Sequence, residues 1–496
     1  MALATTLVAT TAARGEAVFF DNAKIPMRDG VNLAADIYLP SNRAEKIGCF
    51  MQLSPYKATA GEKPWYKARA EDWGVATMSV DCRGLCHSEG VFEPWDPAFP
   101  DDAWDLLDWI SRQPWSNGRV VMVGGSYPGA GQLACMRSGH PALVACAPSV
   151  VTFDAYTINY ANGILETPFQ KGWHTGLAGE ASWAELSRHP DPADPYWTAR
   201  SDLRKLKESR GRAFYQAGWY DKLGVATFES FAKMPAGSFL RIGPWSHGVN
   251  TFDKPDISYA GDKGGAVTED LELDFLRSAL EGREPATAKL PGKILMYVMG
   301  RNEWRYANEW PLPGTQDRRL YFGKDFGLSF EKDAEAGEDA FAYDPENPVP
   351  SRGGRIIHAG GQYEQSDIEA RDDVLCYTTA PLEADLEVIG AVSASIRASS
   401  TAPVADVAVK LVDVHPDGKA YNVVDTVARG AFKPGRATSL EFRVDVTAFA
   451  FLKGHRIRVE IAGSCAPHYD KAAEPATTRL HRGGGDASFL TLPVAP

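Results

Sequence analysis

A serine flanked by glycines stands where an apolar stretch gives way to small, helix-compatible residues. Ser126 lies in the segment Gly124-Gly125-Ser126-Tyr127-Pro128-Gly129, after the apolar run 119–123 and before the stretch 130–138. A strand-to-helix turn of this kind is sharp, so side chains in place of Gly124 or Gly129 would collide with neighbouring elements. A serine presented in this way can act as a nucleophile if a nearby base removes its proton.

The base and the group that orients it can be sought further along the chain. A nucleophilic serine needs a histidine as base and a carboxylate that holds the histidine. Asp221 follows the strand-like run 213–219, and His247 follows the run 239–243 and a Gly/Pro turn. Sites in α/β sheets lie at the carboxyl ends of strands, so we expect Ser126, Asp221 and His247 to form a catalytic triad.

Other histidines and acids fit these roles less well. His140 and His189 each precede a proline where a helix is expected to end, and the histidines from residue 358 onward fall in a β-rich region. His174, Asp194 and Asp202 lie between residues 150 and 206, where the strand pattern fades.

Acyl transfer through a serine also requires two hydrogen-bond donors for the oxyanion. The backbone N–H of Tyr127, directly after the serine, supplies one. The second is expected from the loop after the third strand, residues 53–57, where the phenol of Tyr56 could donate. A half-buried core aromatic is an equally good interpretation of Tyr56 on these grounds alone.

The elements that position these residues follow from the hydrophobic pattern. Strand-like and helical runs alternate from residue 17 to about 147, which predicts a mostly parallel sheet covered by helices. One helix is predicted over 103–113, with a sheet-facing stripe that includes Leu106 and Ile110. The alternation resumes at 213–219 and closes with a helix over 269–280. Short β-rich runs follow, among them 293–299, and predict an all-β sandwich or jelly roll.

These patterns predict a domain division. We expect a discontinuous α/β catalytic domain at 15–149 and 207–290. A cap insertion at 150–206, with a helix at 182–189, and a β-sandwich at 291–496 complete the chain.

Composition excludes several classes of function. The chain has 496 residues, 44% of them hydrophobic, and a net charge of −12 without a basic block, which argues against nucleic acid and anionic membrane surfaces as partners. Seven cysteines, with Cys49, Cys82, Cys135 and Cys146 in apolar contexts, indicate buried reduced thiols. No apolar span reaches the roughly 18 residues of a transmembrane helix. The stretch 1–14 lacks the basic start of a secretory signal, so we expect a disordered tail and a cytoplasmic location.

Several segments together resemble one known group, the cocaine esterase/X-prolyl dipeptidyl-peptidase or CocE/NonD hydrolases. In chain order they are Ser54-Pro55-Tyr56-Lys57, Gly124-Gly125-Ser126-Tyr127-Pro128-Gly129, Gly218-Trp219-Tyr220-Asp221, Gly243-Pro244-Trp245-Ser246-His247-Gly248 and Met299-Gly300-Arg301-Asn302-Glu303-Trp304-Arg305. The resemblance implies an α/β-hydrolase domain, a helical cap and a C-terminal jelly roll over about residues 17 to 490. It also implies Ser126, Asp221 and His247 as the triad, the Tyr56 phenol and the Tyr127 amide as the oxyanion hole, and no metal or organic cofactor.

This chain departs from the pattern of the group at two places. In the loop 81–88 Cys86 replaces a usual glycine; Cys82, Cys86 and His87 lack a fourth ligand at useful spacing, so we expect no metal there. Relatives that prefer α-amino acid esters carry acidic residues just after the triad aspartate, whereas Asp221 is followed here by Lys222 and Leu223. A substrate ammonium is therefore disfavoured, and Leu223 indicates an apolar wall.

Aromatic residues of the insertion are further candidates for the substrate pocket, with cap-to-sheet packing as the alternative. They are Phe153, Tyr156, Tyr160, Phe169 and Trp173, of which Trp173 is the first choice.

We therefore expect a carboxylesterase that acts on a small-molecule ester through an acyl-enzyme. Amide hydrolysis of the acylase or dipeptidyl-peptidase type, with the same residues, is the alternative. A non-enzymatic binding protein is disfavoured because no triad member is missing. A homodimer is possible.

Overall fold

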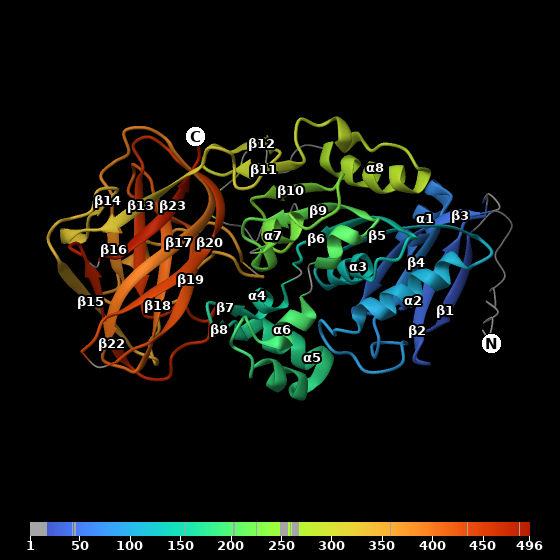
Figure 1. The fold of residues 1–496 in the computed structure, drawn as a ribbon, viewed down its shortest axis with the longest axis horizontal. Helices are drawn as coiled ribbons and strands as arrows, with labels where there is room; N and C mark the ends of the chain where they lie inside the picture. The colour runs from blue at the N-terminus through green and yellow to red at the C-terminus, as the bar shows by residue number, and fades with distance from the viewer. Residues whose placement is uncertain are drawn as a thin grey trace.

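The computed structural model describes residues 17–41, 43, 46–152, 154–201, 204–224, 226–248, 256–257, 259, 267–357, 359–433, 435–485 and 487–496. The expected tail at 1–14, Phe153 and Asp202 lie outside these residues. Figure 1 shows an α/β part at one end of the molecule, a β-sandwich at the other and a small helical cap beside the middle. The predicted fold class is confirmed.

A ten-stranded sheet forms the α/β part, in the order β1-β2-β4-β3-β5-β6-β9-β10-β11-β12. Its central strands run parallel, while β1, β2 and β12 pair antiparallel with their neighbours. The strands are β1 (Val18–Pro26), β2 (Asn32–Leu39), β3 (Ile47–Ser54), β4 (Ala76–Asp81), β5 (Ser116–Gly125), β6 (Leu143–Ser149), β9 (Arg212–Gly218), β10 (Phe239–Gly243), β11 (Ile294–Val298) and β12 (Glu303–Ala307). The carboxyl ends of β3, β5, β9 and β10 therefore meet at one edge of the sheet.

Helices cover both faces of this sheet. They are α1 (Pro64–Trp73), α2 (Phe99–Ser111), α3 (Tyr127–Ser138), α7 (Thr227–Phe231) and α8 (Val267–Glu281). Helix α2 buries Leu106 and Ile110, as the periodicity of the sequence predicts. Helix α8 packs on the other face, where Phe275 contacts the cluster that contains Phe50 and Phe214. Adjacent residues of one strand point to opposite faces, so central strands such as β4 and β10 are buried along their whole length and are mostly apolar.

The catalytic sheet continues beyond residue 291, where the sequence analysis began the β-sandwich. The predicted strand 293–299 is β11, which pairs parallel with β10 through Leu240 and Ile294. Every residue of β11 is buried. A strand that is apolar on both faces fits beside the centre of a parallel sheet, which explains why its placement in the sandwich was wrong.

The cap is built from the segment between β6 and β9. Its elements are α4 (Ala155–Asn159), β7 (Tyr160–Ala161), β8 (Ile164–Leu165), α5 (Thr167–Leu186), α6 (Pro195–Arg200) and the 3₁₀ turn η1 (Arg204–Glu208). The helix predicted at 182–189 is only the end of α5. Gly179 interrupts α5 with a φ of 84°, which hides the longer helix from a search for regular periodicity.

The C-terminal part is a sandwich of a seven-stranded and a four-stranded sheet. The larger sheet contains β13 (Gln316–Phe322), β14 (Leu328–Ser329), β15 (Gly337–Tyr343), β17 (Leu386–Ser400), β20 (Thr438–Phe451), β22 (Ala476–Arg482) and β23 (Phe489–Val494). The smaller sheet contains β16 (Leu375–Thr378), β18 (Val404–Val414), β19 (Ala420–Ala431) and β21 (Arg456–Ala462). A single helical turn, α9 (Ser366–Glu369), precedes β16.

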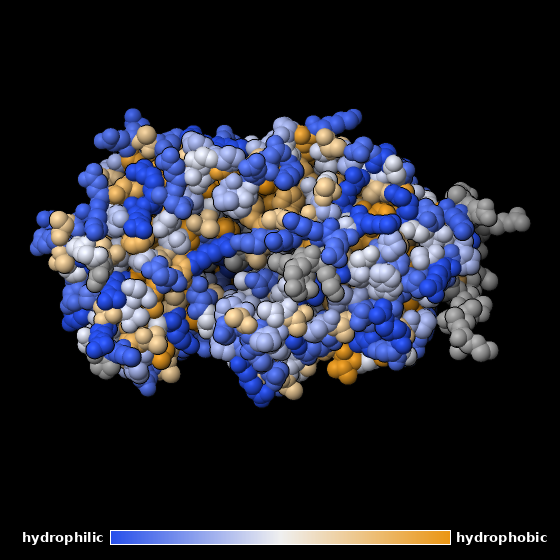
Figure 2. All heavy atoms as spheres, in the orientation of Figure 1, coloured by the Kyte–Doolittle hydropathy of each residue, from blue (hydrophilic) through white to orange (hydrophobic). Residues whose placement is uncertain are grey.

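Surface and cysteine chemistry agree with the composition. On the face drawn in Figure 2, hydrophilic residues cover most of both parts and hydrophobic ones form separate patches. All seven cysteines are unpaired, and Cys49, Cys82, Cys135 and Cys146 are buried, as expected. None of the helices among the described residues is long and apolar enough to cross a membrane.

Candidate active site

Ser126 stands in the turn between β5 and α3 with a strained backbone. Its φ is 61° and its ψ is −134°, a conformation that costs a non-glycine residue on the order of 1–3 kcal/mol. The Ser126 N–H donates to the carbonyl of Ser149 at 3.0 Å, which helps to hold the turn. A Cβ atom on Gly124 would lie 2.6 Å from Pro128, and one on Gly129 would lie 2.7 Å from Val151. The glycines are therefore required by close packing around the serine.

Asp221 and His247 complete a hydrogen-bonded chain with this serine. His247 Nε2 lies 2.9 Å from Ser126 Oγ, and His247 Nδ1 lies 2.8 Å from Asp221 Oδ1. Asp221 is fully buried, whereas the His247 side chain keeps 20% of its surface exposed. The structure thus brings together the three residues that the sequence analysis selected. With Nδ1–H donated to the carboxylate, Nε2 is left to accept the serine proton.

The histidines and acids that were alternative candidates for the base and its carboxylate have other surroundings in the structure. His189 lies 2.8 Å from Asp194, which also caps α6. His140 lies 3.9 Å from Asp108. His174 is buried among the rings of Trp95, Trp173 and Trp183, and burial lowers its pKa to about 4, so it is neutral at pH 7.

Two hydrogen-bond donors lie beside the serine. Tyr127 is the first residue of α3, where a backbone N–H has no acceptor within the helix. Tyr56 follows β3, and its hydroxyl interacts with Ser126. Tyr56 keeps 46% of its surface exposed, and partial burial of its phenol raises the pKa of that group, an effect that the hydrogen bonds with Trp173 and Ser126 only partly oppose. The phenol therefore keeps its proton at neutral pH and can donate it in a hydrogen bond.

Trp173 of the cap fixes the direction in which Tyr56 can donate. Trp173 Nε1 donates to the Tyr56 hydroxyl oxygen at 2.9 Å. An indole N–H can only donate, so Tyr56 must accept from it and its own proton points elsewhere. The sequence marked Trp173 as a pocket residue, but it carried no signal for this contact between residues 117 positions apart.

The cavity at the serine is small and mostly apolar. Its volume is about 30 Å³, and the residues that line it are Tyr56, Trp95, Ser126, Tyr127, Ala130, Val151, Ile158, Phe169, Gln170, Trp173, Leu223 and Ile357. Trp173, Leu223 and Phe169 lie where the sequence analysis expected them. Tyr156 and Tyr160 instead stack on each other, with ring centroids 5.2 Å apart, and pack against Trp197.

Ile357 shows that the C-terminal part also contributes to this pocket, which no local pattern in the sequence predicts. A second cavity of about 170 Å³ shares Phe169 and Ile357 with the first, and Lys222 and Glu166 line its polar end. The interior next to the serine therefore continues past Phe169 and Ile357 towards Lys222 and Glu166.

Lys222 directly follows Asp221 and is buried in an ion pair. Its Nζ lies 2.6 Å from Glu166 Oε2 of the cap, and His468 Nε2 lies 3.4 Å from the same oxygen. Burial by itself would raise the pKa of Glu166, but Lys222 and His468 together hold it below the usual range. The residues next to Asp221 in the sequence gave no sign of a carboxylate near the site, but Glu166 supplies one from the cap. Its charge is already compensated by Lys222.

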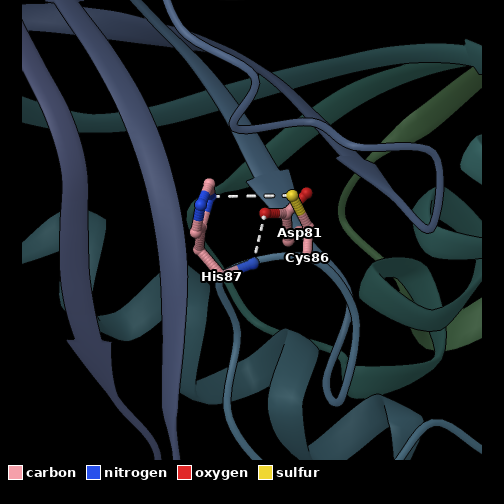
Figure 3. A group of neighbouring side chains, drawn as sticks. All are labelled: Asp81, Cys86 and His87. Atoms are coloured by element: carbon pink, nitrogen blue, oxygen red, sulfur yellow. Dashed lines mark hydrogen bonds between the residues drawn. The ribbon is translucent and has the colours of Figure 1, made fainter.

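The loop 81–88, where Cys86 replaces a usual glycine, supports the segment that carries Tyr56. Asp81 accepts hydrogen bonds from the N–H groups of Ala58 (2.6 Å) and Thr59 (3.2 Å), from the Thr59 hydroxyl, and from the His87 N–H at 3.3 Å. Figure 3 shows Cys86 and His87 beside this carboxylate, with Sγ 3.6 Å from Nδ1. Asp81 thereby anchors the segment that follows Tyr56. Cys86 has a φ of 51°, which explains why glycine suits this position.

Two family descriptions match separate regions of the chain. Residues 29–188 match the X-Pro dipeptidyl-peptidase (S15 family), and residues 287–490 match the X-Pro dipeptidyl-peptidase C-terminal non-catalytic domain. The second match covers the β-sandwich and also β11 and β12.

Individual proteins resemble the whole chain. Cocaine esterase of Rhodococcus sp. (strain MB1 Bresler) is 31% identical over 95% of this chain and 98% of its own. The solved structure of an α-amino acid ester hydrolase has a TM-score of 0.84 at 23% identity and covers 100% of both chains. A CocE/NonD family hydrolase from Staphylococcus aureus has a TM-score of 0.78 at 16% identity, over 97% of this chain and 94% of that one.

Because the two solved structures are only 23% and 16% identical to this chain, they support the fold alone. The family is shown by the cocaine esterase relative, which matches nearly the full length of the chain, and by the two regions that match X-Pro dipeptidyl-peptidase domains. The chain therefore belongs to the cocaine esterase/X-prolyl dipeptidyl-peptidase (CocE/NonD) group of serine hydrolases.

Proposed function

We propose that this protein is a carboxylesterase that forms an acyl-enzyme on Ser126. The observation that carries the proposal is the chain from Ser126 Oγ through His247 to the buried Asp221, with distances of 2.9 Å and 2.8 Å. Serine, histidine and carboxylate in this connection form a complete proton-transfer system for acyl transfer.

The reaction follows from the positions of these groups. His247 Nε2 takes the proton of Ser126 as Oγ attacks the ester carbonyl, and Asp221 stabilises the imidazolium that results. The Tyr127 N–H and the Tyr56 hydroxyl donate to the oxyanion. The imidazolium then protonates the departing alcohol, and water, deprotonated by the same histidine, releases the acid from Ser126.

The shape of the interior favours a short acyl group. A pocket of about 30 Å³ is much smaller than an apolar cavity of roughly 150 Å³, which is large enough to bind benzene. The neighbouring cavity of about 170 Å³ offers space for the alcohol portion. We therefore propose short-chain esters, such as acetyl esters of larger alcohols, as the substrate class.

Substrates with a free α-amino group fit this site poorly. The carboxylate of Glu166, which lines the neighbouring cavity, is paired with Lys222 at 2.6 Å. An ammonium would have to displace a buried lysine, and a buried ion pair that loses one partner costs about 3–5 kcal/mol. X-prolyl dipeptidyl-peptidase activity, which the family descriptions would allow, is disfavoured for this reason.

Hydrolysis of esters and anilides that differ only in the leaving group tests the proposal. p-Nitrophenyl esters from two to eight acyl carbons and the matching anilides are mixed with the protein and with Ser126→Ala, and the pre-steady-state burst is recorded. An ester burst that disappears in the variant and is largest for acetyl supports the proposal. Activity confined to anilides would instead indicate an acylase or peptidase, and unchanged activity in Ser126→Ala would refute the triad.

A further inference from the structure

Strand geometry in the β-sandwich brings two histidines and an aspartate to one face of the smaller sheet. Asp413 lies near the end of β18, His415 follows that strand, and His455 directly precedes β21. The two strands pair antiparallel with Val414 opposite Arg456, so the next pair in register is His415 and His455. Residues two apart on a strand, and residues directly opposite on neighbouring strands, point to the same face.

The side-chain atoms are as close as the ligands of one metal ion. His455 Nδ1 lies 3.0 Å from both oxygens of Asp413, and His415 Nε2 lies 3.2 Å from Oδ2. One ligand atom from each residue falls within 4.8 Å of the other two. Ligands about 2.0–2.1 Å from a tetrahedral zinc ion lie roughly 3.3–3.4 Å apart, so small side-chain movements would admit the ion.

The charge of Asp413 also points to a cation. This carboxylate is buried, and its partners among the described residues are the two imidazoles. Three other buried carboxylates of the sandwich are paired with permanent cations: Asp406 with Arg429, Asp445 with Arg355, and Glu460 with Lys410, whereas the buried Asp425 accepts from the Cys465 thiol. A neutral imidazole supplies a hydrogen bond but no full positive charge. Asp413 therefore has no permanently charged partner of the kind that these three carboxylates have.

Asp81, Cys86 and His87, drawn in Figure 3, also lie close enough together to bind a metal, but their carboxylate already has other hydrogen-bond donors. Asp81 already accepts from two loop N–H groups, from the Thr59 hydroxyl and from the His87 N–H, so a metal would have to break the anchor of the Tyr56 segment. Asp413 has no such backbone donors among the described residues, and a metal would replace only its hydrogen bonds with the histidines.

We propose that Asp413, His415 and His455 bind one divalent transition-metal ion, with zinc as the reference ion and water at the remaining position. Imidazole and carboxylate ligands suit zinc, nickel and copper, and the exposed fraction of the His415 side chain, 31%, leaves a path from solvent. The ion would link the β18–β19 turn to the start of β21. Binding to the folded state alone stabilises that state by mass action.

Titration of untagged, chelator-treated protein with zinc chloride tests this site by calorimetry, and cobalt(II) absorption reports its coordination. Because Cys86 is an exposed thiol that could bind zinc elsewhere, the titrations use Cys86→Gly as the background. We expect one equivalent of zinc and a higher thermal midpoint. His455→Ala should weaken binding at least tenfold and abolish the thermal shift.

Two further variants make the outcome unambiguous. His415→Ala changes the more exposed ligand, so it should fold even if His455→Ala does not, and it should weaken binding in the same way. His481→Ala, which alters a histidine of the same sandwich that contacts Ser399, is the matched control and should bind zinc normally. The proposal fails if the background protein shows no saturable binding, or if His415→Ala binds zinc as tightly as the control.

Discussion

The contact between Trp173 and Tyr56 yields a quantitative test of the proposed oxyanion hole. Trp173→Phe keeps an aromatic ring in the cap but removes the N–H that donates to the Tyr56 hydroxyl at 2.9 Å. A neutral hydrogen bond contributes about 1 kcal/mol, which corresponds to about a fivefold change in rate. Tyr56→Phe removes the donor itself, and losing one oxyanion donor lowers kcat by about 10²–10³-fold.

The two substitutions together separate positioning from catalysis. If Trp173 acts only by orienting the Tyr56 hydroxyl, Trp173→Phe should lower kcat about fivefold in the wild type and have little further effect in Tyr56→Phe. The assay is steady-state hydrolysis of p-nitrophenyl acetate by all four proteins, with kcat and KM determined separately.

Trp95→Phe is the matched control for this cycle. Trp95 lines the same pocket and its ring lies 5.5 Å from that of Trp173, but its Nε1 has no hydrogen-bond partner among the residues that the structure describes. We expect kcat to change less than in Trp173→Phe. Equal losses in the two variants, or a full fivefold loss from Trp173→Phe in the Tyr56→Phe background, would refute the orienting role.

Three further outcomes are expected. Leu223→Ala should enlarge the pocket and raise kcat/KM for hexanoyl relative to acetyl esters, whereas Leu186→Ala in the cap core should not; equal ratios in both variants would argue against Leu223 as a pocket wall. Burial lowers the pKa of His174 from 6.5 to about 4. Between these two pH values the unfolded chain binds a proton that the folded protein excludes. The free energy of unfolding is therefore highest above pH 6.5 and decreases as the pH falls towards 4. The thermal midpoint of His174→Phe should therefore fall less than that of the wild type between pH 7.5 and 4.5. In free energy of unfolding the two proteins should differ by up to about 3 kcal/mol over this range, and parallel midpoint curves would contradict this. Cys86→Gly relieves a positive φ of 51° and should keep full esterase activity with an equal or higher thermal midpoint, so a large loss in calorimetric scans would assign the thiol another role.

Much of the α/β part could be predicted from the sequence because its signals are local. The run 239–243 coincides with β10, and α2 buries the stripe that its periodicity indicates. Local signals failed where packing decided the result. The kink at Gly179 masks α5, and β11 resembles a strand of a sandwich until its pairing with β10 is known.

The composition of the pocket illustrates the same limit. Trp173 and Leu223 could be predicted as pocket residues because apolar and aromatic side chains near a catalytic serine often line its substrate pocket. Ile357, by contrast, comes from the C-terminal part, and Glu166 reaches Lys222 from the cap. Neither residue stands in a motif, so their roles depend on how three parts of the chain assemble.

The sequence by itself determined which residues can carry the chemistry and in what order. Ser126, Asp221 and His247 each follow an apolar strand, and parallel strands must bring their carboxyl ends to one edge of a sheet. Only the tertiary structure decided the size of the pocket, the direction of the Tyr56 hydroxyl, the compensation of Glu166 and the meeting of His415 with His455. These features depend on contacts between side chains far apart in the chain, and such contacts are set by packing and strand register, which leave no periodic trace in either partner's local sequence.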